Sequence, residues 1–451
     1  MSWCRRALAR GGLVATAHTL HHTLKLGRDE LETLRLPVDL LDRFPRWRTG
    51  SRAGFLPPRR FATLDPAGAA LPLGPIRLQL TESSGAARLV LPLLRGLEVA
   101  LDPGTPITVL TDPGRAGPVL RRLGRSVLRD PRRVRFETGR SASAYARDHA
   151  LAAHAANGAA VLLIPRGFRP HRGNADPALD ARAARRTFGV TVRRSLLYWE
   201  GGNILCDGHR ALVGADLVRE NMARLGLARD EVVAILEAEF GMRIAVLGSV
   251  SRAAFDATQD RLSRSGQASY HIDLDVCPLG ANDAGRPVVM LTDPRLGLRV
   301  LGRVLSHPRL AEGHGLPTAM GRRLLAAEYR RVAAERGGRL VAYRRQLERA
   351  GYEVRALPEL RVDTERPRVG LGNLDFSYAN ALPARHRGRP GVYFLPWGIP
   401  PLDDLAARQW ERAGVVPVAI ADFPPLAHGM MELAAGLHCF VGAVPALRPV
   451  G

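Results

Sequence analysis

The sequence is almost without lysine, although it carries a net charge of +22 over 451 residues. Lys25 is the only lysine among 65 basic residues, so the rest are arginines, and these are scattered rather than gathered in one patch. No aromatic-interleaved basic run or known nucleic-acid motif is present. Such one-sided use of arginine, with abundant Ala, Gly and Pro, is typical of a GC-rich genome. We therefore expect no nucleic-acid partner.

Cysteine is also rare. The four cysteines, Cys4, Cys206, Cys277 and Cys439, are far apart and have no Cys-x-x-Cys spacing, which argues against a disulfide framework and against a tetrahedral zinc site. Three N-terminal arginines precede a mildly apolar stretch, 11–17, but no convincing cleavage site of a secretory signal follows. A reducing cytoplasm fits this pattern best.

Long apolar runs are absent. Spanning a bilayer takes roughly 18 apolar residues or more, whereas the longest stretches here, such as 159–165, have the length of a strand. With 46% hydrophobic residues, the chain can bury one large core or two ordinary ones. We expect a soluble globular protein with no membrane partner.

Strand-like and helix-like stretches alternate from about residue 75. We expect strands at 76–80, 106–110, 159–164, 194–199, 211–213, 244–247, 288–291, 352–356, 392–395 and 415–420. Helices are expected at 87–97, 230–240, 324–351 and 402–413, the second with Asp230 as a candidate N-cap. There is no Gly-x-Gly-x-x-Gly motif and no P-loop. The recurrence of strand, helix and strand favours a repeated α/β architecture.

A histidine alternates with carboxylates in segment 269–276. In an extended strand, His271, Asp273 and Asp275 would point to one face and place an imidazole beside a carboxylate. Isolated patterns of this kind also occur on solvated strand faces with a surface histidine. The meaning of this segment therefore depends on the other motifs.

Two further carboxylates lie in short polar segments. Glu200 follows the apolar stretch 196–199 and precedes two glycines, which suit either a charge aimed into a cleft or a plain hairpin turn. Asp148 follows Arg147, and this pair is equally typical of an exposed ion pair.

Cys439 lies in segment 436–441, Gly-Leu-His-Cys-Phe-Val. A free cysteine in apolar surroundings is ordinarily a small buried hydrophobe. Taken together, however, the segments supply a soft nucleophile, an imidazole to move protons and three carboxylates that can bind a planar cation. This combination favours cleavage of a guanidinium C–N bond.

The ordered set resembles the guanidino-modifying enzymes of the pentein superfamily, closest to the branch of agmatine deiminases and bacterial peptidylarginine deiminases. The family's Trp-x-Arg-Asp, Glu-Gly-Gly-Asn, His-x-Asp and His-Cys motifs are similar to 145–148, 200–203, 271–273 and 438–439. Segment 376–380 resembles the family's Ser-Tyr-x-Asn strand, and 401–415 resembles the helix before its last strand. Two positions differ: Tyr145 replaces a tryptophan, and Val441 replaces a threonine.

The resemblance spans about residues 75–445 and implies an α/β propeller, with repeated strand-helix-strand modules around a pseudo-fivefold axis. Residues 71–451 would form this catalytic domain, and the Arg/Pro-rich residues 1–70 an N-terminal extension or arm. The stretch 278–321, which holds Gly, Pro and His, is expected to be an insertion or loop.

The resemblance also implies a mechanism and roles. The nucleophilic thiolate attacks the guanidinium carbon, and the product is a ureido compound plus ammonia, formed through a Cys-thiouronium intermediate without a metal or an organic cofactor. The catalytic residues would be Cys439, His271 and Glu200. The substrate-binding residues would be Asp148, Asp273, Arg147, Tyr145 and Asn203.

Several alternatives stay open at this point. The guanidine could be agmatine, arginine, methylarginine or peptidyl arginine, and no pattern assigns an oligomeric state. An amidinotransferase would use the same side chains but pass the amidino group to an amine, and a dimethylaminohydrolase would act on methylated arginine. A catalytically silent guanidine-binding module is the alternative from a different class. A cysteine protease fits least, because three carboxylates suit a cation better than a peptide carbonyl.

Overall fold

The computed structural model describes residues 62–80, 86–111, 113–114, 116–139, 145–166, 185, 189–249, 271–308, 319–362, 376–420 and 436–444. The signal-like start and residues 1–61 of the expected arm lie outside these ranges. Residues 62–70 pack against the rest of the fold. Strand β1 (Thr63–Leu64) pairs with β5 (Leu151–His154), and the Ala69 N–H donates to Leu279 O at 2.8 Å.

Five separate sheets form the framework of the described part of the chain. The first contains β1, β5, β6 (Ala160–Ile164) and β7 (Thr191–Arg194). The second contains β8 (Ile204–Cys206), β9 (Ala211–Gly214) and β10 (Ile244–Leu247). The third contains β11 (Val276–Ala281), β12 (Pro287–Asp293), β13 (Glu353–Leu360) and β14 (Phe376–Ser377).

The other two sheets involve the C-terminal part of the chain. One contains β15 (Leu382–Pro383), β16 (Gly391–Phe394) and β17 (Val416–Ala419). The other contains β18 (Gly442–Ala443), β2 (Ile76–Leu80), β3 (Ile107–Thr111) and β4 (Val134–Thr138). In this last sheet β18 pairs antiparallel with β2, so segments from the two ends of the described chain share one sheet.

The same strand pattern recurs in every sheet: an antiparallel pair, and a third strand parallel to the second. Parallel neighbours need a crossover connection, commonly a helix. The helices between such strands are α5 (Ala86–Ala100), α6 (Ala116–Ser126), α9 (Ala215–Leu225), α10 (Arg229–Phe240), α12 (Pro294–Leu305), α14 (Ala319–Arg349) and α15 (Pro400–Arg412). The prediction of repeated α/β units is confirmed.

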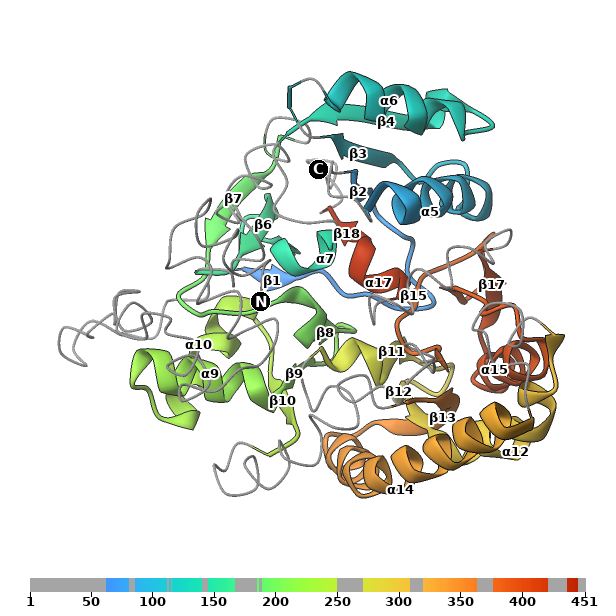
Figure 1. Ribbon diagram of the computed structural model, residues 1–451. Helices are drawn as coiled ribbons and strands as arrows, with labels where there is room; N and C mark the ends of the chain where they lie inside the picture. Colours follow the sequence, from blue (N-terminus) through green and yellow to red (C-terminus); the bar gives the residue numbers. More distant parts are fainter. Residues whose placement is uncertain are drawn as a thin grey trace, which may run out of the picture.

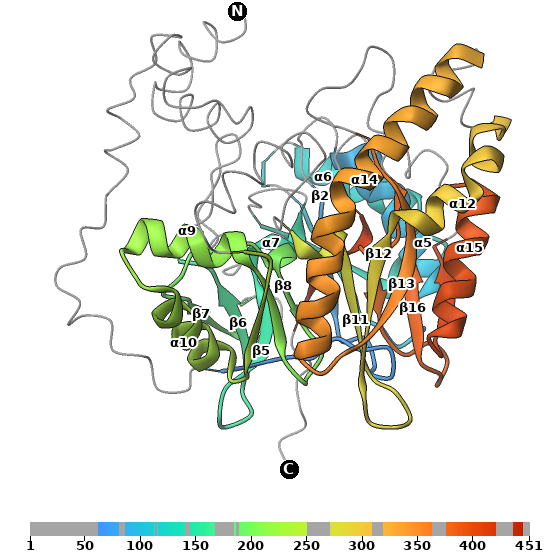
Figure 2. The ribbon, with the colours of Figure 1, turned by 90° about the horizontal axis from the view of Figure 1, so that it is seen from below.

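The sheets lie around a central region that holds two short helices, α7 (Ala146–His149) and α17 (Leu437–Phe440), while the crossover helices lie on the outside (Figure 1). Figure 2 shows α12 and α14 beside the sheet of β11, β12 and β13. The sequence of α5 explains this layering. Leu89, Leu93 and Leu97 recur every four residues and are buried in the same hydrophobic cluster as Ile76 and Leu78 of β2.

Each strand expected from the sequence has a counterpart in the structure except 194–199, which was a wrong prediction. Strand β7 ends at Arg194, and residues 195–200 form no strand, although the Ser195 N–H still donates to Ile164 O of β6 at 2.8 Å. Side chains from the neighbouring helices bind the next backbone groups. Glu239 accepts the Leu196 N–H at 2.6 Å, and Asn221 accepts the Tyr198 N–H at 2.8 Å.

Two other expectations also need correction. The stretch 278–321 contains β12 and α12, whose buried residues join the core, so most of its described part is regular structure rather than loop. The apolar residues Val300, Leu301 and Val304 provide the buried face of α12. Helix α10 begins at Arg229, and its cap is Ala228, whose N–H donates to Glu231, rather than Asp230.

None of the described helices combines the length and the hydrophobicity that crossing a lipid bilayer requires.

Candidate active site

Glu200 lies at the end of the irregular segment 195–200 and directly before a single 3-10 turn, η3 (Gly201–Asn203). Its side chain is buried, and Oε2 lies 2.9 Å from His271 Nε2. The following glycine backbone passes close under the imidazole, since a Cβ on Gly202 would lie 2.6 Å from His271 Nδ1. The glycine is therefore needed for the close approach of Glu200 and His271.

His271 does not lie on a strand, so the expected extended segment 269–276 is a wrong prediction. His271 has left-handed backbone angles, φ 55° and ψ 72°, and caps a 3-10 turn, η4 (Ile272–Leu274), before β11 begins at Val276. The alternation of side chains along a strand consequently does not apply. Asp275 instead binds three arginines: Arg336 and Arg361, which are buried, and Arg339, which is partly buried.

Asp148 lies on α7 and meets the Glu200 segment. Its Oδ1 accepts the Gly202 N–H at 3.0 Å and lies 3.9 Å from His271 Nε2. Two buried carboxylates, Asp148 and Glu200, therefore approach the same imidazole nitrogen.

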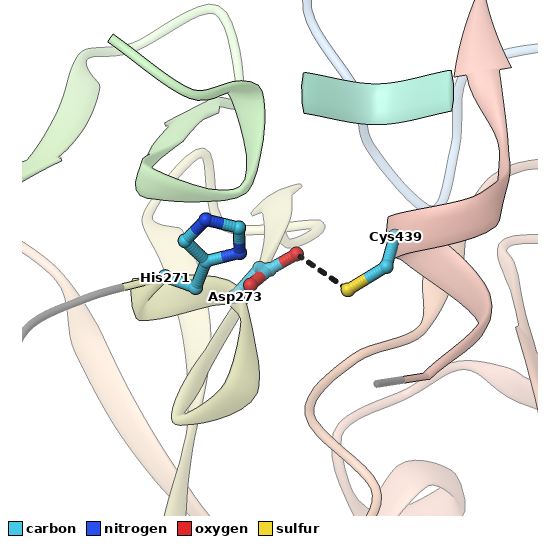
Figure 3. Close-up of side chains that lie close together, drawn as sticks. All are labelled: His271, Asp273 and Cys439. Carbon is cyan, nitrogen blue, oxygen red and sulfur yellow. Dashed lines mark hydrogen bonds between the residues drawn. The ribbon is translucent and has the colours of Figure 1, made fainter. Parts of the chain in front are cut away.

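Cys439 lies on α17, directly before β18. Its Sγ donates to Asp273 Oδ2 over 3.9 Å, and His271 lies on the far side of Asp273 (Figure 3). The Cys439 sulfur, a carboxylate oxygen of Asp273 and a ring nitrogen of His271 all lie within 4.8 Å of one another. Asp273 is 1% exposed and Cys439 4% exposed, so the thiol and the carboxylate face each other away from solvent.

The three other expected substrate-binding residues lie around this group. The Arg147 guanidinium donates to the carbonyls of Gly201 at 3.2 Å and Ile204 at 2.8 Å, so it braces the η3 turn. The Tyr145 ring packs on Phe440 with centroids 5.2 Å apart. Asn203 is buried in η3, and its Oδ1 has no partner among the described residues. The structure thus brings all eight expected site residues into one region.

The charges of the site are unbalanced toward the negative. Burial raises the pKa of Asp148 to about 6, although His271 opposes this shift. Burial tends to lower the pKa of His271, but Asp148, Cys439 and Glu200 together raise it well above its usual value. Burial and Asp273 raise the pKa of the Cys439 thiol to about 11. The site therefore favours added positive charge.

Two residues of this region were missing from the expected site. His438 Nδ1 lies 2.8 Å from Asp273 Oδ2, and Asn380 contacts both the backbone and the sulfur of Cys439. In both cases the sequence motifs contained the residue. His438 precedes the cysteine in the His-Cys pair, and Asn380 ends the segment 376–380 that resembles a family strand.

The cluster of His271, Asp273 and Cys439 offers one nitrogen, one oxygen and one sulfur, a donor set that would also suit a soft divalent cation.

Solved structures with the same fold can be compared with this chain. An agmatine deiminase from Enterococcus faecalis is 13% identical, with a TM-score of 0.58, over 86% of this chain and 96% of the other. An agmatine deiminase from C. jejuni, with substrate bound, is 13% identical, with a TM-score of 0.57, over 86% of this chain and 98% of the other.

No protein-family model matches the sequence. A search of curated proteins gives no match either. At 13% identity the structural likeness shows the fold alone. The chain has the mixed α/β fold of the pentein superfamily, the fold of the agmatine deiminases.

Proposed function

We propose that this protein is a guanidine deiminase that hydrolyses agmatine or an arginine-type substrate to a ureido product and ammonia. One observation carries the proposal: Asp273 Oδ1 is buried with no hydrogen-bond partner among the described residues, next to the Cys439 thiol. A buried carboxylate oxygen needs a donor. A guanidinium ion supplies paired N–H donors and positive charge together.

Asp148 and Asp273 are the proposed binding groups for the cation. They lie on α7 and η4, and both are close to the imidazole of His271. A guanidinium held between them would present its central carbon to Cys439, because Asp273 already contacts the sulfur. His271 Nε2 lies 3.9 Å from Asp148 Oδ1, so a substrate nitrogen bound to Asp148 would lie near the proton on that imidazole.

The thiol needs the substrate in order to react. With its pKa raised to about 11 by burial and by Asp273, Cys439 is protonated at neutral pH. A bound cation lowers this pKa, and the thiol proton then leaves to solvent. The thiolate attacks the guanidinium carbon and forms a C–S bond. His271 donates its proton to the departing nitrogen, ammonia leaves, and a thiouronium remains on Cys439.

Hydrolysis reverses the direction of proton transfer. The now neutral imidazole takes a proton from water, whose oxygen attacks the thiouronium carbon. The C–S bond breaks, the thiolate leaves, and the protonated ureido group releases its extra proton. Glu200, 2.9 Å from Nε2, favours the protonated imidazole at the start of the next cycle.

We also propose that the five sheets are the blades of a propeller around a pseudo-fivefold axis, with residues 71–451 as the catalytic domain and residues 1–70 as its arm. The repeated strand pattern of the five sheets supports this arrangement. Metal, organic cofactor and nucleic acid have no part in the proposed reaction, which we place in the cytoplasm.

A substrate panel tests the function. The purified chain is given agmatine, arginine, methylated arginine and an arginine peptide, each with and without glycine or ornithine as acceptor. We expect ammonia and a ureido product without acceptor. Turnover only with an acceptor would identify an amidinotransferase, dimethylamine release a dimethylaminohydrolase, and no turnover of any guanidine a binding module.

The nucleophile is tested separately. Acid quenching during turnover should leave an amidino adduct on the peptide that contains Cys439. Cys439→Ser should lose at least about a thousandfold in kcat. Cys206→Ala, which removes another buried free thiol, is the matched control. Equal turnover by Cys439→Ser and the control would refute the assignment.

A further inference from the structure

The segment 376–380 connects the two halves of the candidate site. At its start, the Ser377 hydroxyl donates to the Leu274 carbonyl at 2.8 Å and so holds the η4 turn that carries Asp273. At its end, Asn380 contacts Cys439. The two contacts join residues that are 103 and 59 positions apart in the chain, respectively. One short segment thereby sets the position of the carboxylate turn relative to the thiol.

Asn380 makes two hydrogen bonds to Cys439 with one amide group. Its Oδ1 accepts the backbone N–H of Cys439 at 3.2 Å, and its Nδ2 donates to Sγ at 3.3 Å. A backbone N–H can only donate, so the oxygen of the amide must face it. The NH₂ group must then face the sulfur, and a flipped amide would place two donors against each other.

The amide has little freedom to leave this position. Asn380 is buried, and Gly436 lies against it so closely that a Cβ there would come within 2.6 Å of Asn380 Oδ1. Any other residue at 436 would push the amide away from the thiol. The glycine just before α17 is thus part of the same contact.

The donor onto sulfur matters because the other influences on Cys439 largely oppose its ionisation. Burial, Asp273 and Asp148 raise the pKa of the thiol. Among the charged groups that face the thiol, His271 lowers its pKa. A thiol sulfur is a weak acceptor, whereas a thiolate accepts strongly. A fixed N–H at Sγ therefore stabilises the thiolate more than the thiol.

We propose that Asn380 is a further catalytic residue of this site: its Nδ2 stabilises the Cys439 thiolate and its Oδ1 orients the cysteine. The inference rests on the proposed function in that it takes Cys439 as the nucleophile. It adds to that function a neutral donor that contacts the reacting atom and introduces no positive charge to compete with the substrate.

Alkylation of Cys439 tests this without any turnover. The second-order rate of iodoacetamide with the full chain is measured at about pH 8 on the Cys439 peptide by mass spectrometry, where the rate follows the thiolate fraction. Loss of a hydrogen bond to a charged group raises the thiol pKa by about one to two units. Because a more basic thiolate is also a better nucleophile, Asn380→Ala should be slower by about three- to tenfold.

Asn380→Asp keeps the size of the side chain and the oxygen that accepts the Cys439 N–H. It should be slower than Asn380→Ala, because it loses the donor and adds a like charge beside the thiolate. Asn157→Asp, in the exposed β5–β6 turn, keeps the oxygen that accepts the Ala159 N–H; it is the matched control and should react like wild type. Unchanged protection of Cys206 and Cys277 shows that the variants are folded.

Rates of Asn380→Ala and Asn380→Asp equal to wild type would overturn the inference. The two proposals can fail separately. Slower alkylation in a protein that turns over no guanidine would support Asn380 and refute the deiminase, whereas turnover with unchanged alkylation would refute Asn380 alone.

Discussion

His438 Nδ1 lies 2.8 Å from Asp273 Oδ2, so the neighbour of the proposed nucleophile holds the carboxylate proposed to bind the substrate. Burial and Arg147 lower the pKa of His438 despite the carboxylate beside it. A neutral imidazole donates one N–H, and the proximity of Asp273 places it on Nδ1. This donor occupies Oδ2 and leaves Oδ1 for the substrate.

Removing that donor should weaken substrate binding more than it affects the fold. We expect His438→Ala to lower kcat/KM by about ten- to a hundredfold, mainly through KM, because Asp273 loses a fixed hydrogen bond. His438→Asn, whose amide can reach the position of Nδ1, should restore part of the loss. An unchanged KM in His438→Ala would contradict the role given to this pair.

Activity should rise with pH across about pH 6. The pKa of Asp148 is raised to about 6 by burial, and only its ionised form binds a guanidinium strongly. Asp148→Asn keeps an oxygen for the Gly202 N–H but should lose about ten- to a hundredfold in kcat/KM and the rise near pH 6. The measurement is a kcat/KM profile.

The matched control for this profile is Asp216→Asn, on the partly exposed face of α9. It should reproduce the wild-type curve. If Asp148→Asn shows the same rise as the control, another group is responsible for it.

Stability should depend on pH through Glu239. Burial raises its pKa from 4.5 to about 7, although Leu196 and Ser195 donate to it. A carboxyl with a raised pKa stabilises the fold fully below its unfolded pKa, and this contribution is lost as pH rises through the folded value. From about pH 4 to pH 8 the loss is about 3 kcal/mol.

Glu239→Gln cannot ionise and should remove this part of the pH dependence. Urea unfolding of both proteins across the range measures it. Their free energies of unfolding should diverge in favour of the variant above about pH 7. Parallel curves would mean that Glu239 is not the group that titrates.

Asp275, directly after η4, forms a buried ion network with arginines and Glu359. The stability of the fold should be far more sensitive to mutation of this network than to mutation of a surface ion pair. Arg336 is fully buried and donates to Asp275 at 2.6 Å and to Glu359 at 3.0 Å. Arg336→Met leaves two buried carboxylates short of a partner and should cost about 3–5 kcal/mol. Arg295→Ala removes an exposed arginine paired with Asp293 and should cost less than about 1 kcal/mol.

Similar losses in the free energy of unfolding for the two variants, measured by chemical unfolding, would contradict this difference in burial.

The pKa of Asp275 is held at about 2, since the three arginines outweigh the effect of burial. Its contribution to stability is present above the unfolded value of 3.8 and is lost as pH falls through about 2.

The sequence predicts the regular elements well where hydrophobic periodicity is strong, as in β2, α5 and α14. It fails at 195–200 and 271–275, where side chains distant in sequence determine the backbone. Glu239 lies 43 positions from Leu196, and Arg361 lies 87 positions from the Leu274 carbonyl to which it donates. Local pattern carries no information about such partners.

For the site, residue types and their order are enough to collect the chemically active side chains, but not to assign their contacts. Arg147 is an example: it was expected to bind substrate, and its guanidinium donates to two backbone carbonyls of the protein. Asn380 shows the converse: it ends a segment that resembles a family strand, but a neutral amide reveals no role beside the nucleophile until its distance to Cys439 is known.

The pairing of β18 with β2 has a consequence for the synthesis of this protein. Strand β2 emerges from the ribosome among the first described elements, whereas β18 and Cys439 emerge last. Until then one edge of β2 lacks its antiparallel partner, and an open strand edge is a site for aggregation. A chain cut short before α17 would therefore lack both the proposed nucleophile and the partner of this edge of β2, and we expect it to aggregate.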